Sequence, residues 1–277
     1  RPRRGWRLNT IRSKTGLVLG YKGLDETIRR TYIRCSPTPK RVTLEGLKIE
    51  ANIPSHADMT WEISISCDIK PRRSRVFLSY DRANREADRA LQKAKSSDAH
   101  VYTSNEQFNH WLNRSMADLH MLISETPQGF YPYAGVPWFS VPFGRDGIIT
   151  ALQMLWVKPA VARGVLGFLA ATQATEVRPE QDAEPGKILH ETRQGEMAAL
   201  GEIPFGKYYG SVDATPLFIV LAGAYYERSG DRRFLTTLWP HIQLALQWID
   251  QYGDPTGMGF TTYARQTASG LVHQGWK

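Results

Sequence analysis

Hydrophobic and polar residues alternate along the first seventy positions, which is the pattern of β-strands. In residues 61–69 the odd positions are apolar and the even positions are polar, which predicts a strand with one buried and one solvent-exposed face. Residues 47–53 alternate in the same way, and residues 17–21 and 31–35 are further short apolar segments. Glycines and prolines separate these segments at turn-like intervals. The pattern favours part of an antiparallel β-sandwich.

The pattern then changes to that of helices. Residues 82–95 are polar and rich in helix formers, which predicts a solvated linker helix followed by a break. Between residues 108 and 123, apolar residues recur at spacings of three, four and seven, and Ser104 with Gln107 predicts a capping box before them. Further helices are expected over residues 148–156, 159–175, 213–229 and 231–252. The domain boundaries that follow are 1–80 for the strands, 81–103 for the linker helix and 104–277 for the helical domain.

Composition and charge exclude several classes of protein. The chain has 277 residues, of which 42% are hydrophobic and 22% charged, so it is neither disordered nor collagen-like. No apolar run approaches the roughly 18–20 residues that cross a bilayer, and no membrane partner is expected. Cys35 and Cys67 cannot form a disulfide framework, so a reducing, cytoplasmic compartment is expected.

The positive charge is concentrated in the first hundred residues. The formal net charge is +8. Residues 1–100 carry 22 Lys and Arg against 11 Asp and Glu, while residues 101–277 carry 13 against 16. The cations are scattered along alternating segments and no nucleic-acid-binding motif accompanies them. Solvated strand faces are therefore expected rather than a nucleic-acid partner.

Two long loops hold the candidate chemistry. The first, residues 126–147, combines Trp138 and Phe143 with Arg145 and Asp146 at the start of a helix. Aromatic rings cover the apolar face of a sugar, and a guanidinium beside a carboxylate can hold adjacent hydroxyls. A structural salt bridge, with Asp146 capping the following helix, explains the same residues equally well.

The second loop, residues 178–212, has three glutamates within twelve residues and ends at Asp213. Its carboxylates suit acid–base work or the binding of hydroxyls. The alternative is a set of solvated charges with Asp213 as a helix N-cap. His190, His241 and His273 are widely separated in sequence, so no metal site is expected. No glycine-rich phosphate loop or nucleophile elbow occurs, and no cofactor is expected.

Four segments in order along the chain resemble the bacterial amylo-α-1,6-glucosidase, or glycogen debranching enzyme-like, family: residues 136–147, 187–197, 208–216 and 273–277. Residues 29–69 resemble its N-terminal β domain. The resemblance implies a partial N-terminal antiparallel β-sandwich of glycogen-debranching type, followed by the first part of the (α/α)6 barrel of a glycosidase catalytic domain.

The resemblance also implies a substrate site. Phe143, Arg145 and Asp146 would grip the non-reducing glucose, Asp213 would lie at the rim, and Trp276 would stack near the scissile bond. The full set of expected substrate-binding residues is Trp138, Phe143, Arg145, Asp146, Glu191, Arg193, Glu196, Asp213 and Trp276.

The implied reaction is hydrolysis of an α-glucosidic bond with inversion, by an acid and a base that lie roughly 6.5–9.5 Å apart. In the family the acid is expected just after the position of Lys277 and the base further on. The chain by itself is therefore expected to be inactive, as a fragment of an α-glucosidase acting on glycogen-type glucans or small α-glucosides. The alternatives are a carbohydrate-binding module without hydrolysis, and an enzyme resembling trehalase or glucosylglycerate hydrolase.

Overall fold

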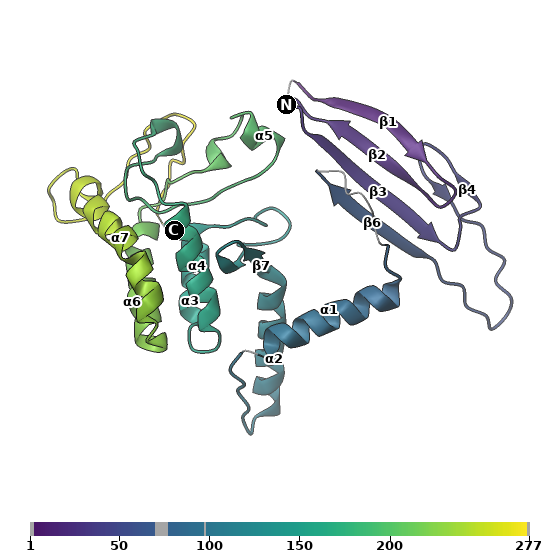
Figure 1. Ribbon diagram of the computed structural model, residues 1–277, viewed down its shortest axis with the longest axis horizontal. Coiled ribbons are helices and arrows are strands. Elements are labelled where there is room, and N and C mark those ends of the chain that lie inside the picture. The colour runs from purple at the N-terminus through teal and green to yellow at the C-terminus, as the bar shows by residue number, and fades with distance from the viewer. Residues whose placement is uncertain (1–2, 70–76, 97, 276–277) are drawn as a thin grey trace. The chain divides into compact units, whose positions relative to one another are not determined.

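The computed structural model describes residues 3–69, 77–96 and 98–275. The chain divides into two compact units, a strand unit of residues 1–92 and a helical unit of residues 93–277. Together they give a mixed α/β composition, with a four-stranded antiparallel sheet and seven α-helices among the described residues (Figure 1). No helix of this described part is long and apolar enough to cross a membrane.

The sheet of the strand unit follows the chain closely. Its strands are β1 (Trp6–Arg12), β2 (Gly16–Lys22), β3 (Ile28–Ser36) and β6 (Glu62–Asp68), paired antiparallel in that order. Between β3 and β6, the two-residue strands β4 (Arg41–Val42) and β5 (Leu47–Lys48) form a separate ladder. The apolar segments at residues 17–21, 31–35 and 61–69 therefore become strands, as predicted.

The predicted burial of the β6 apolar face is wrong. Register places Ile33 of β3 opposite both Leu17 and Ile65, so apolar side chains gather on one face of the sheet. Nevertheless Ile63 is 56% exposed and Ile65 is 65% exposed. Leu17 and Cys35 on the same face are buried, so among the described residues of the strand unit it is the part of this face formed by β6 that is left open.

Of two other expectations for the strand unit, a strand is found to be shorter than predicted and a helix is confirmed. The strand predicted over residues 47–53 extends only through β5, and the residues after it are exposed and irregular because no partner strand pairs with them. The helix predicted over residues 82–95 is confirmed as α1 (Tyr80–Lys95), which begins two residues earlier. The carboxylate of Glu62 accepts a hydrogen bond of 3.2 Å from the Tyr80 N–H at its start.

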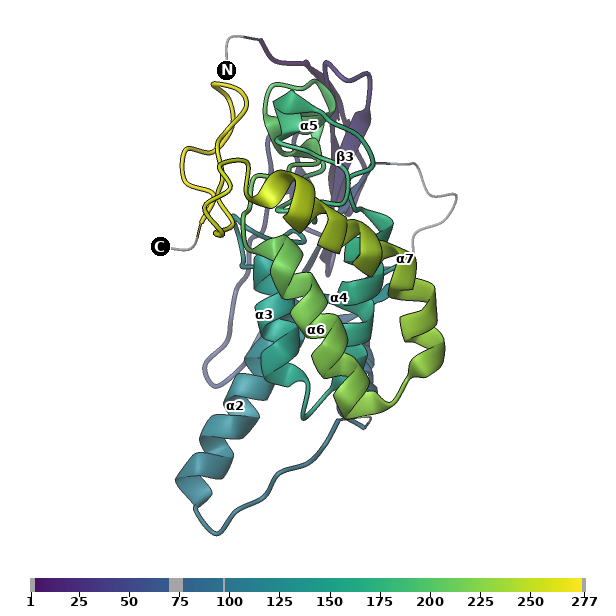
Figure 2. The ribbon, with the colours of Figure 1, turned by 90° about the vertical axis from the view of Figure 1, so that its left-hand side faces the viewer.

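The helical unit is built around three helices that contact one another: α3 (Gly144–Met154), α4 (Pro159–Ala171) and α6 (Ala214–Ser229) (Figure 2). Helix α7 (Arg232–Trp248), which ends in a π-helical turn (Ile249–Gly253), packs on α6 and α4. Helix α2 (Glu106–Leu122) precedes them. The core includes the fully buried side chains of Ile148, Leu166, Leu169, Phe218 and Leu221.

Several predicted helix boundaries and caps are wrong. The side chain of Asn105, and not the Ser104–Gln107 box, caps α2 by accepting from the N–H of Phe108. Helix α3 begins at Gly144 rather than at residue 148, so Asp146 lies inside the first turn and cannot be its N-cap. There a carboxylate still interacts favourably with the helix dipole. Helix α4 ends at Ala171, four residues earlier than predicted.

A hairpin that the sequence pattern does not reveal follows α2 and extends into the first long loop. Strands β7 (Ile123–Thr126) and β8 (Gly129–Pro132) pair around a two-residue turn. The hairpin packs on α4 so closely that a Cβ on Gly164 would lie 2.2 Å from the carbonyl oxygen of Phe130. Glycine is therefore required at this position.

The connections that carry the candidate residues lie at the end of the helical unit where α3 and α6 begin (Figures 1 and 2). They include the loop before α3 and the long segment between α4 and α6. That segment contains a 3-10 turn (Pro179–Gln181), the short helix α5 (Glu196–Ala199) and a second 3-10 turn (Pro204–Gly206). Helix N-termini expose unpaired N–H groups, so this end is the polar end of these two helices.

Candidate functional site

Short backbone bridges join three of the four segments singled out in the sequence, residues 136–147, 187–197 and 208–216. Phe143 pairs with Glu191, and Glu191 pairs in turn with Tyr208. The N–H of Gly144 donates to the carbonyl of His190 at 2.8 Å, and the N–H of His190 donates to the carbonyl of Tyr208 at the same distance. Segments separated by tens of residues thus form one surface.

Arg145 and Asp213 are brought together across 68 residues of sequence. Nη1 of Arg145 lies 3.1 Å from Oδ2 of Asp213, and the two side chains are 11% and 24% exposed. The Ser211 hydroxyl donates to the other carboxylate oxygen of Asp213 at 2.6 Å. Asp213 occupies the N-cap position of α6 but makes no side-chain capping bond, so the capping alternative is wrong. Its carboxylate orients a guanidinium at the edge of solvent.

A second pair, Glu191 with Arg193, lies on the adjacent segment. Nε of Arg193 donates to Oε2 of Glu191 at 2.7 Å, and the guanidinium stacks over the ring of Phe205. Burial raises the pKa of Glu191 above its ordinary value, against the lowering effect of Arg193, and the charge of Asp146 adds to the rise. Asp146 itself lies in the first turn of α3, next to Arg145 in the sequence.

Phe143 and His190 form the apolar floor between the two pairs. Phe143 is 8% exposed and meets His190 edge-on, with ring centroids 5.5 Å apart. On its other side, His190 meets Tyr208 edge-on at 5.9 Å. The pKa of His190 is lowered to about 4, because burial disfavours the charged ring and the Arg145 cation repels it. The imidazole is consequently neutral at physiological pH.

The remaining predicted residues are more dispersed. Trp138 is 79% exposed. It lies at the tip of a loop whose two sides are joined by a backbone bridge between Gly135 and Phe139. Glu196 is half-buried as the first residue of α5. Trp276 lies outside the described residues.

A buried carboxylate that sequence reasoning missed anchors the last described segment. Asp182 is 1% exposed and accepts hydrogen bonds from the hydroxyl of Tyr208 at 2.6 Å, the N–H of Gln266 at 2.7 Å and Nε2 of Gln274 at 3.0 Å. The Tyr208 hydroxyl accepts in turn from the N–H of Leu271 at 2.6 Å. Because Tyr208 pairs with Glu191, this network holds residues 266–274 against the site. No local sequence signal identifies Asp182, since its partners lie 26 to 92 positions away.

A cavity of about 430 Å³ borders the site between the hairpin turn, the loop before α3 and the segment after Glu191. It is lined by both polar and apolar side chains, among them those of Thr126, Tyr133, Phe168, Thr192 and Gln194. This volume falls within the range of small-molecule pockets.

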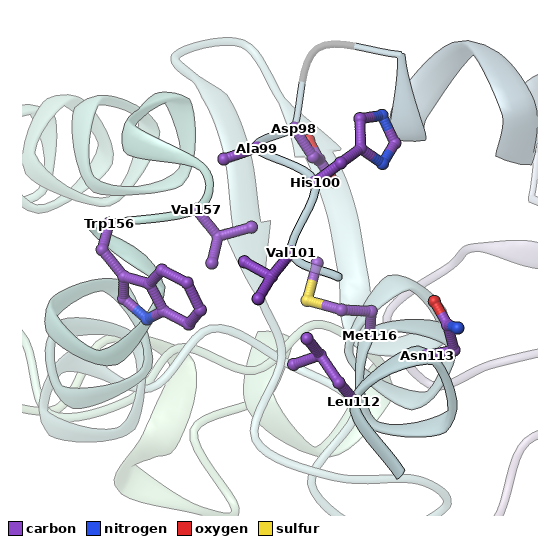
Figure 3. Close-up of a pocket in the computed structure, with 9 residues that line it drawn as sticks. All are labelled: Asp98, Ala99, His100, Val101, Leu112, Asn113, Met116, Trp156 and Val157. Carbon is purple, nitrogen blue, oxygen red and sulfur yellow. The ribbon is translucent and has the colours of Figure 1, made fainter. Parts of the chain in front are cut away.

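A smaller pocket lies at the opposite end of α3. In Figure 3 the side chains of Val101, Leu112, Met116, Trp156 and Val157 face a common space, whereas His100 points away from it. Helix α3 has 11 residues, so about 16 Å of helix separates this pocket from Arg145. Asp98, which also lines this pocket, forms a buried ion pair with Lys158, and its Oδ2 lies 3.2 Å from Nε2 of His120. These contacts hold the segment before α2 against the start of α4.

The site can hold a polyhydroxylated ligand through two oriented Arg–carboxylate pairs, an apolar floor and an adjacent cavity. The described residues contain no group of three or more His, Cys, Asp or Glu side chains arranged to hold a metal ion. Comparison with known proteins returned no matching family model and no matching curated protein. The assignment of function therefore depends on the geometry of this site.

Proposed function

We propose that the chain carries the sugar-gripping part of an inverting α-glucosidase of the amylo-α-1,6-glucosidase type, which acts on glycogen-type glucans or small α-glucosides. The observation that carries the proposal is the convergence of the three motif segments on one surface through the Phe143–Glu191–Tyr208 bridges. Residues that merely resembled the motifs by chance would not be expected to meet. Arg145 with Asp213, and Arg193 with Glu191, would hold the outer hydroxyls of a terminal glucose.

The same proposal includes the finer description of the fold. The sheet of the strand unit would be part of an N-terminal β-sandwich, and α2 to α7 would be the first part of an (α/α)6 barrel. Sequential helices that pack on one another, with site loops gathered at one end, support the barrel. The exposed apolar face of the sheet, with Ile63 and Ile65, supports the sandwich because such a face requires a second layer.

One observation favours a second candidate, a carbohydrate-binding module without hydrolysis. Glu191 and Asp213 each accept a hydrogen bond from an arginine. The hydrogen bond from an arginine favours the ionised form of each carboxylate, which suits it to orienting a guanidinium beside a bound ligand. We therefore assign Glu191 and Asp213 to substrate binding, and we assign neither of them as the catalytic acid or base.

Binding of maltose to the 277-residue chain, measured by isothermal titration calorimetry, tests the shared part of both candidates. Arg145→Ala should weaken binding at least tenfold, because hydrogen bonds to charged groups contribute about 1.5–3 kcal/mol each. The matched control is Arg114→Ala, which removes an exposed Arg–Asp pair on α2 and should leave affinity unchanged. Equal affinity of the Arg145→Ala variant and the wild type would refute the gripping role.

Hydrolysis separates the two candidates. An inverting enzyme containing this chain should release β-glucose from an α-glucoside, visible as the β-anomeric proton signal before mutarotation. Initial release of the α-anomer would contradict inversion, and binding without turnover in that longer polypeptide would favour the module.

A further inference from the structure

The imidazole of His190 lies at the centre of the candidate site, yet neither Arg–carboxylate pair uses it. Arg145, Asp213 and Arg193 are the charged groups whose fields reach the ring. His190 is 7% exposed, so it is more than nine-tenths buried beneath these groups. Phe143 and Tyr208 fix its plane by meeting it edge-on from two sides.

Nδ1 of this buried ring has no hydrogen-bond partner among the described residues. A buried polar atom left unpaired is destabilising, and native proteins pair nearly all such atoms with protein groups, water or ligands. His241 provides the contrast, since its Nδ1 lies 2.8 Å from Oε1 of Gln173. The unpaired nitrogen therefore retains a hydrogen-bonding capacity that the described residues do not use.

The chemistry of that group follows from the charge state of the ring. At neutral pH the imidazole carries one proton, so Nδ1 can donate or accept according to the tautomer. A neutral hydroxyl, which can do either, matches both tautomers. A half-turn about the Cβ–Cγ bond exchanges Nδ1 with Cδ2, so a ligand can recruit the nitrogen without moving the backbone.

We propose that His190 is a specificity-determining residue, which hydrogen-bonds a neutral hydroxyl of the bound ligand through Nδ1. This inference rests on the proposed sugar site and adds a contact to it. The two Arg–carboxylate pairs select for polyhydroxylated ligands in general, because they can rearrange among neighbouring oxygens. His190 selects for a hydroxyl that lies in the plane of its ring, since Phe143 and Tyr208 hold that plane.

The test uses the wild-type chain with ¹⁵N-labelled histidine and maltose as the probe. Ring-nitrogen shifts report protonation, tautomer and hydrogen bonding, so Nδ1 of His190 should shift on addition of maltose. The ring nitrogens of His241, which already has its partner, should not move and serve as the internal control.

Two variants identify the nitrogen concerned. The side-chain amide of His190→Asn lies near the position of Nδ1, and that of His190→Gln lies near the position of Nε2. Loss of one neutral hydrogen bond corresponds to about a three- to tenfold change in affinity. His190→Asn should bind maltose within threefold of wild type, and His190→Gln should bind three- to tenfold more weakly. His241→Asn is the matched control and should bind like wild type.

The outcomes separate this inference from the proposed function. Binding that is weakened by Arg145→Ala while the His190 resonances stay fixed overturns the role of His190 and retains the sugar site. Failure of maltose to bind the folded wild-type chain overturns both. A shift of the His190 resonance with the order of affinities above supports both, and the labelling measurement needs no variant to fold.

Discussion

Replacing Gly144 with alanine is the most direct way to force the site segments apart. A Cβ at this position would lie 1.9 Å from the carbonyl oxygen of Leu189, whereas real Cβ atoms do not approach closer than 3.0 Å. The backbone must therefore separate by about 1.1 Å. Overpacking of this kind costs about 1–3 kcal/mol, and loss of the bond from the Gly144 N–H to His190 adds about 1 kcal/mol. We expect the free energy of unfolding to fall by about 2–4 kcal/mol.

Urea unfolding followed by tryptophan fluorescence measures this change, because Trp248 is buried in the helical unit. With a urea dependence of about 2 kcal/mol per molar, the midpoint should fall by about 1–2 M. Gly223→Ala is the matched control: this glycine lies on the exposed side of α6, and nothing lies within 4 Å of the position that a Cβ would take there. That variant should gain about 0.5–1 kcal/mol from helix propensity. A Gly144→Ala variant within 0.5 kcal/mol of wild type would refute the close contact between the segments.

Buried and uncovered groups give three further predictions. Because the pKa of His190 is lowered to about 4, the unfolded state binds its proton first, so the free energy of unfolding should fall by about 3 kcal/mol in total as pH drops from about 6.5 to 4. His190→Asn should remove most of this fall in acid-unfolding curves, and an unchanged pH dependence would contradict the lowered pKa. Tyr208→Phe removes the hydroxyl that donates to Asp182 and accepts from Leu271, so residues 266–274 should detach from the site. Limited proteolysis within these residues should become at least tenfold faster. Tyr226→Phe, at a half-exposed tyrosine on α6, is the control and should leave the rate unchanged. Replacing both Ile63 and Ile65 with threonine should reduce binding of a hydrophobic dye by the native chain, and undiminished fluorescence would place the apolar surface elsewhere.

The fold could be predicted where one pattern dominates a segment. Strand β6 follows from its alternation of apolar and polar residues, helix α2 from apolar residues at helical spacings, and helix α1 from its content of helix formers. The hairpin of β7 and β8 could not be predicted, since its four-residue strands are too short to show a period and they follow directly on the last turn of α2. The exposure of Ile65 could not be predicted either, because alternation shows which side chains share a face and says nothing of what covers it.

The site could be predicted as a set of residue types and not as a set of contacts. The sequence shows Arg145 beside Asp146, and that adjacency suggests a pair between neighbours. In the structure Arg145 pairs instead with Asp213, because α3 and α6 begin side by side and direct both side chains to the same end. His190 stands in one of the motif segments, but its importance depends on burial and on an unpaired nitrogen, which only packing reveals.

The hydrogen bond from Gln274 to Asp182 also bears on the order in which the chain folds. It closes a loop of 92 residues, and the entropy lost on closing a loop rises with its length. The hairpin of β7 and β8 and the β1–β2–β3 meander pair neighbours along the chain, so they can form early, whereas this bond must wait until α6 and α7 have packed. The segment that Asp182 holds against the site would therefore be the last part of the helical unit to become ordered during folding.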